Sequence, residues 1–74
     1  MKYNKEIILA CGAAIKELDA IRDYTEKIDA TENEDMKKVY ENNRMDELPH
    51  IQNLVVAITS MLEDKEPKTA TEME

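Results

Sequence analysis

The sequence is poor in the residues that cross-link or interrupt a chain. Its 74 residues include one cysteine, one glycine and two prolines. A single cysteine excludes an internal disulfide framework, which favours a reducing compartment. No run approaches the ~18 consecutive apolar residues of a membrane span, and the apolar run before Cys11 is too short for a secretion signal. We therefore expect a soluble, cytoplasmic protein in which Cys11 is a small, buried helix residue.

Positive charge is also scarce. The chain has ten lysines and arginines and 17 aspartates and glutamates, which gives a formal net charge of -7. Such a chain repels nucleic acid and anionic lipid, so we expect neither nucleic acid nor a membrane as a partner. The hydrophobic core of so short a chain supplies only ~3 to 5 kcal/mol of folding stability, so such chains usually gain further stability from metals, disulfides or oligomerisation. Cations and self-association are the remaining options.

Apolar residues recur at helical spacing in two long segments. The first runs from about residue 4 to residue 29, and its stripe contains Ile7, Cys11, Ala14, Leu18, Ile21 and Ile28. After a break at residues 30–34, Thr31 or Asn33 can cap a second helix, which we expect to run to about Leu62. Tyr40, Glu47, Leu54 and Met61 follow one another there at steps of seven residues.

The short connection determines the expected fold class, which is all-α. About five residues between two long helices permit only an antiparallel arrangement, so residues 1–63 should form a two-helix hairpin. A lone hairpin leaves the far side of both apolar stripes in water. We therefore expect two chains to dimerise into a ferritin-like four-helix bundle. Residues 64–74 lack an apolar period and contain Pro67, which predicts a flexible tail.

One acidic residue, Glu17, lies among apolar neighbours in the first helix. Ala10, Ala13, Ala14, Ala20, Ile21 and Tyr24 occupy the offsets of three, four and seven residues. Burying an ionised carboxylate without a partner costs several kcal/mol, so Glu17 either reaches the bundle edge or meets a cation. Without a metal its charge is unfavourable, and we expect its pKa to be raised.

The only histidine, His50, follows Glu47 by three residues. Positions i and i+3 of a helix face the same way, and Glu-x-x-His is the motif of carboxylate-bridged di-iron bundles. His50 could instead be a histidine that bonds a backbone carbonyl or a nearby acid. However, Glu17 and Glu47 are each 15 residues from Glu32, near the turn. This count predicts that both carboxylates lie at the same level of the hairpin.

Pairing two hairpins about a two-fold axis would collect two copies each of Glu17, Glu47 and His50. The four carboxylates carry a charge of -4, which two divalent ions neutralise. Oxygen-rich ligation with one imidazole per metal suits Fe(II) or Mn(II), with zinc as a substitute. The sequence therefore predicts two divalent metal ions per dimer.

This set of residues resembles the encapsulated ferritin-like proteins, whose short two-helix subunits assemble a di-iron ferroxidase centre between two subunits. The resemblance covers about residues 16–62, and its motifs are Glu17, Tyr24, and the run Asn43-Arg44-x-x-Glu47-x-x-His50. It implies that Glu17, Glu47 and His50 bind iron, that Tyr24 assists beside the centre, and that dimers associate into rings. It also implies an encapsulin shell as a partner. Tyr24 can alternatively be a core aromatic with its hydroxyl at the bundle edge.

The chain departs from the family pattern at three points. Pro49 stands inside the motif and lacks the N–H that would reach the carbonyl of Met45, which predicts a kink between these two residues. Lys16 stands where family members carry an extra acid, which leaves Asp19 and Asp46 as candidates to guide iron inward. The tail contains no Gly- and Leu-containing docking peptide for a shell.

Two functions from different classes follow. The leading hypothesis is a ferroxidase that oxidises Fe(II) to Fe(III) with O₂, for iron storage or detoxification. The alternative is a non-catalytic, acidic helical dimer that binds protein partners, in which Glu17 and His50 are merely accommodated.

Overall fold

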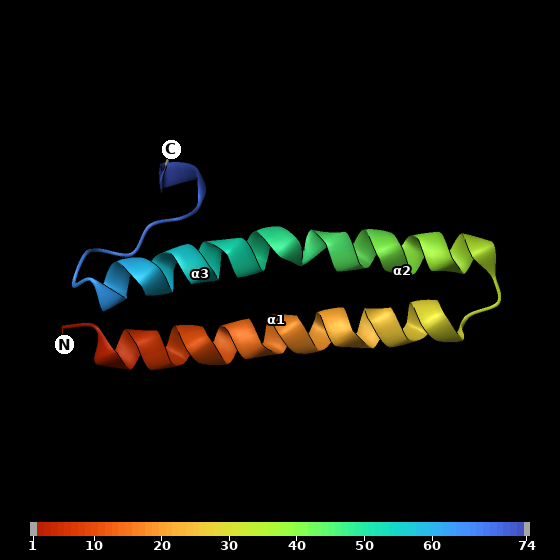
Figure 1. The fold of residues 1–74 in the computed structure, drawn as a ribbon, viewed down its shortest axis with the longest axis horizontal. Helices are drawn as coiled ribbons and strands as arrows, with labels where there is room; N and C mark the ends of the chain where they lie inside the picture. The colour runs from red at the N-terminus through yellow and green to blue at the C-terminus, as the bar shows by residue number, and fades with distance from the viewer. Residues whose placement is uncertain (1, 74) are drawn as a thin grey trace.

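The described part of the chain is helical and contains no strand. The computed structural model describes residues 2–73 and consists of α1 (Asn4–Ala30), α2 (Glu34–Asp46), α3 (Leu48–Leu62) and a short 3₁₀ helix, η1 (Thr71–Met73). Figure 1 shows that α2 and α3 return alongside α1 in the opposite direction, and the short third extent of the molecule makes this arrangement a flat layer. The Cα atoms extend over 49 × 25 × 10 Å. The predicted all-α class is confirmed.

The connection between α1 and α2 is held by side-chain hydrogen bonds. Asn33 caps α2, because its Oδ1 accepts the backbone N–H of Met36 at 3.0 Å. The Thr31 hydroxyl accepts the N–H of Asn33 at 3.2 Å. Glu34 and Asp35 follow in the first turn, where the helix dipole favours negative charge. Of the two residues predicted as caps, Asn33 caps the helix and Thr31 supports it.

The returning segment is not one continuous helix. Glu47 separates α2 from α3, and its N–H donates to the carbonyl of Arg44 at 3.2 Å, three residues back instead of four. Pro49 lies in the first turn of α3, where its missing N–H costs least. The prediction of a single second helix is therefore wrong at Glu47, and the break lies inside the segment where the proline predicted a kink.

A stripe of residues on α1 faces a stripe on the segment formed by α2 and α3. We call these two stripes the seam. On α1 the seam consists of Ile7, Ala10, Ala14, Glu17, Ile21, Tyr24 and Ile28. On α2 and α3 it consists of Tyr40, Arg44, Glu47, Ile51, Leu54, Ile58 and Met61. All fourteen are partly or fully buried, but among the apolar side chains only Ile28 and Met61 keep less than a tenth of their surface exposed. The seam is a thin core.

A broad apolar surface remains exposed on one side of the layer. This apolar face consists of Ile8, Ile15, Leu18, Leu48, Val55 and Leu62, which are 53% to 71% exposed. Each follows a seam residue by one position, a rotation of ~100°. Because the helices run in opposite directions, this rotation turns all six toward the same side. Cys11 also follows a seam residue and is exposed, so the prediction that it is buried is wrong for the single chain.

The tail folds back on α3. Asp64 adopts a left-handed backbone with φ 58°, and the Lys65 N–H donates to the carbonyl of Ser60 at 2.9 Å, which is a Schellman ending. Further on, the Ala70 N–H donates to Oδ1 of Asn53 at 2.9 Å. The predicted flexibility of residues 64–74 and the division at residue 63 stay predictions. Within residues 2–73, no helix is both long and apolar enough to cross a membrane.

Candidate metal centre

Three side chains predicted as metal ligands converge at the middle of the seam. Glu17 comes from the centre of α1, Glu47 from the break, and His50 from the first turn of α3. His50 Nδ1 lies 3.5 Å from Oε2 of Glu17 and 3.5 Å from Oε2 of Glu47. One ligand atom from each of the three residues lies within 4.8 Å of the other two.

The geometry of the three donors suits a small divalent cation. Metal–oxygen and metal–nitrogen bonds of ~2.0–2.2 Å place donors on opposite sides of one ion ~4.4 Å apart. A small rotation of these side chains would therefore close the set on a single ion. Two carboxylate oxygens and one imidazole nitrogen suit Fe(II), Mn(II) or Zn(II). One chain supplies three ligands, which leaves coordination positions for further ligands.

The cluster opens on the side opposite the apolar face. Glu17 and Glu47 are seam residues, and their side chains are 29% and 20% exposed. His50 precedes the seam residue Ile51, so it leans away from the apolar face, and its side chain is 60% exposed. The two broad sides of the layer therefore differ in chemistry: one is apolar, and the other gives access to two carboxylates and an imidazole.

The three ionisable groups shift one another's pKa values. The hydrogen bond with Glu17 raises the pKa of Glu47, and desolvation and the negative charge of Glu17 act in the same direction. The pKa of Glu17 is lowered, mainly by its hydrogen bond with Glu47 and then by His50 against an opposing desolvation. Hydrogen bonds to Glu17 and then to Glu47 raise the pKa of His50. Of the two carboxyls in the metal-free chain, Glu47 is therefore the one whose protonated form is favoured.

The pKa of Glu17 differs from the prediction. The sequence predicted a raised pKa for Glu17, because its helical neighbours offer no hydrogen bonds. In the structure Glu17 receives them from the other segment, from Glu47 and His50, so the raised pKa belongs to Glu47 instead. Like charges and desolvation do raise the pKa of one carboxyl of the pair, as expected. Contacts between the helices determine which of the two carboxyls this is.

Tyr24, predicted to assist beside the centre, packs against another aromatic side chain. Its ring centroid lies 6.5 Å from that of Tyr40, with an interplanar angle of 31°. Across the same part of the seam, Nη1 of Arg44 donates to the Thr25 hydroxyl at 3.0 Å, and this hydroxyl donates to the carbonyl of Ile21 at 2.8 Å. The contact with Tyr40 was not predicted from the sequence, although both tyrosines are eight residues from Glu32.

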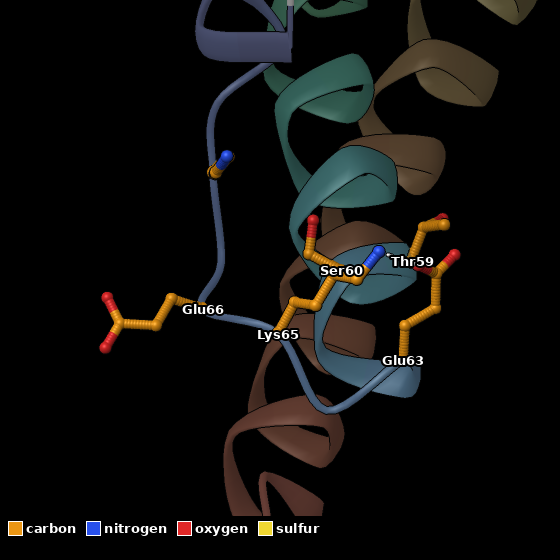
Figure 2. Close-up of a pocket in the computed structure, with 6 residues that line it drawn as sticks. Thr59, Ser60, Glu63, Lys65 and Glu66 are labelled. Atoms are coloured by element: carbon orange, nitrogen blue, oxygen red, sulfur yellow. Dashed lines mark ion pairs between the residues drawn. The ribbon is translucent and has the colours of Figure 1, made fainter.

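A groove near the tail is separate from this cluster. It has a volume of about 450 Å³ and lies where the tail leaves α3 (Figure 2). The residues that line it are of polar or charged type: Thr59, Ser60, Glu63, Lys65, Glu66 and Lys68. Lys65 pairs with Glu63 at 3.0 Å there. None of the three predicted ligands lines the groove, so we assign it no part in metal binding.

Comparison with known proteins identifies no relative. No family model, curated protein or solved structure matches the chain. We therefore infer the function of the chain from the geometry of the cluster.

Proposed function

We propose that the chain is a ferroxidase, which oxidises Fe(II) to Fe(III) with O₂ at a di-iron centre shared between two copies. The observation that carries the proposal is the convergence of Glu17, Glu47 and His50, with each carboxylate 3.5 Å from the same imidazole nitrogen. We propose kinship with the encapsulated ferritin-like proteins on the same residues, and an encapsulin shell as a partner follows from that kinship alone.

Sharing between copies is supported by the shape of the site. Three protein ligands leave one ion incompletely coordinated, and the cluster opens onto a broad side of a layer only 10 Å thick in Cα extent. A second copy related by a two-fold axis on that side would bring a second set of Glu17, Glu47 and His50. The four carboxylates and two imidazoles would then hold two divalent ions without excess charge.

The side chains have defined tasks in this reaction. Iron is the substrate: two Fe(II) ions give one electron each to O₂, and with two protons the products are two Fe(III) ions and hydrogen peroxide. The carboxylates hold both ions close together with open positions, so the protein acts mainly as a template. Binding also requires the ligands to be deprotonated. Glu47 and His50, whose pKa values are raised, would release protons as iron binds.

The test is iron oxidation by purified protein, followed as ferric absorbance after anaerobic Fe(II) loading and exposure to O₂. Glu17→Gln, Glu47→Gln and His50→Ala should each abolish the protein-dependent rate. Glu26→Gln is the matched control, because Glu26 is an exposed glutamate of the same helix as Glu17. Equal rates in the wild type and all three ligand variants would exclude the proposal. Mn(II) and Zn(II) should compete with iron at this site.

The apolar face favours self-association as well, and we propose that it packs against a second copy of this chain. The accessible surface is 5566 Å², whereas a compact monomer of 8.5 kDa exposes about 4,650 Å². Six large apolar side chains are exposed together on one face. Pairing through the cluster on one side and through the apolar face on the other would connect dimers into a ring. If the cluster binds no metal, the apolar face alone supports the alternative function, a non-catalytic helical dimer.

A further inference from the structure

The tyrosine pair has chemistry of its own, beyond the support of a metal site. Tyr24 and Tyr40 are both partly buried in the seam, and the 6.5 Å between their ring centroids is within the range of directly packed aromatic rings. They come from different helices, α1 and α2. Phenol rings packed this closely can join through their ring carbons after one-electron oxidation of each ring.

The pair lies close to the source of oxidant in the proposed reaction. Tyr24 follows Glu17 by seven residues, and Tyr40 precedes Glu47 by seven residues, so the pair is ~10 Å along the helix axis from the cluster. Helical side chains lean toward the N-terminus of their helix, which brings the Tyr24 ring nearer to Glu17. Peroxide released at the cluster would meet these two rings in the same seam.

We propose that Tyr24 and Tyr40 are oxidised as a pair by hydrogen peroxide and become joined as dityrosine, an inference that rests on the proposed ferroxidase function. Each ring loses one electron and one proton in total, and a carbon–carbon bond forms between positions ortho to the hydroxyls. The peroxide O–O bond breaks, and its two oxygens take up the two electrons and two protons as two water molecules. The product ties α1 to α2 covalently and consumes peroxide made with the iron.

The experiment follows iron oxidation and cross-linking in the same samples. After Fe(II) and O₂ are added, ferric absorbance reports the first reaction. Dityrosine fluorescence and an intact mass lower by two hydrogens per link report the second, and digestion should yield a peptide that joins Tyr24 to Tyr40. Tyr24→Phe and Tyr40→Phe should each abolish the link. Tyr3→Phe is the matched control and should retain it, because Tyr3 is the remaining tyrosine of the chain.

The outcomes separate this inference from the proposed function. Iron oxidation without the Tyr24–Tyr40 link overturns the inference and leaves the ferroxidase standing. A link that involves Tyr3, or one that persists in both Phe variants at the pair, overturns it as well. Absence of iron oxidation overturns the ferroxidase, and the inference with it, because no peroxide is then supplied.

Discussion

Placing a charge on the apolar face should weaken association between copies of the chain. Ile15 lies at the middle of this face and is 60% exposed. Full burial of an isoleucine side chain contributes roughly 1.5–3 kcal/mol, so covering its exposed part contributes about 1–2 kcal/mol. A symmetric dimer contains two such side chains, and Ile15→Glu should therefore cost about 2–4 kcal/mol of association free energy, or roughly 30- to 700-fold in Kd.

The assay is sedimentation velocity over a concentration series, with chelator present so that metal-dependent pairing does not contribute. Leu9→Glu is the matched control, because Leu9 is similarly exposed, at 58%, but precedes a seam residue and therefore lies on the opposite side of the layer. Association of Ile15→Glu as tight as that of the wild type would show that the apolar face does not pack against a second copy. Dissociation of Leu9→Glu to the same extent would show the same.

Two further predictions concern stability. The pKa of Glu47 is raised from 4.5 and that of His50 from 6.5, so both groups stabilise the metal-free fold in their protonated forms, and its stability should fall as the pH rises through the raised pKa values. Chemical unfolding in the presence of chelator should show that Glu47→Gln is more stable than the wild type at neutral pH and equally stable below pH 4.5. A Glu47→Gln variant that is less stable than the wild type at neutral pH would contradict the raised pKa of Glu47. Asn33→Ala should remove the cap of α2 at a cost of ~1 kcal/mol, a fall of ~4–8 °C in Tm for a domain of this size, with metal binding unchanged; an unaltered Tm would show that the cap contributes nothing.

The parts of the fold that follow from local counting could be predicted from sequence. Helical period and a short connection indicated two long helical segments, and equal distances from Glu32 placed Glu17 and Glu47 at one level. The same count applies to Tyr24 and Tyr40. These predictions depend only on the constant rise of two helices that run past each other.

Properties that depend on contacts between segments or copies could not be predicted in this way. Hydrogen bonds from Glu47 and His50 to Glu17 determine which carboxyl has the raised pKa. The residues near Glu17 in the sequence do not indicate these hydrogen bonds, because their donors lie in the other segment. Cys11 is exposed because it lies on a side of α1 that does not face α2 and α3. A sequence stripe shows that a residue is apolar, but a thin two-helix layer buries only the part of the stripe that meets the seam.

The break at Glu47 connects the fold to the chemistry of the candidate site. Proline in a helix interior costs ~3 kcal/mol, and it costs far less in the first turn, where no N–H is needed. Ending α2 before Glu47 puts Pro49 in that first turn and leaves Glu47 at the N-terminus of α3. Glu47 also ends α2 as its C-cap, so the dipoles of α2 and α3 act on its charge in opposite directions, and the contact with Glu17 favours a protonated Glu47. A cation between the carboxylates would offset the effect of Glu17 and favour the ionised Glu47 that metal binding requires.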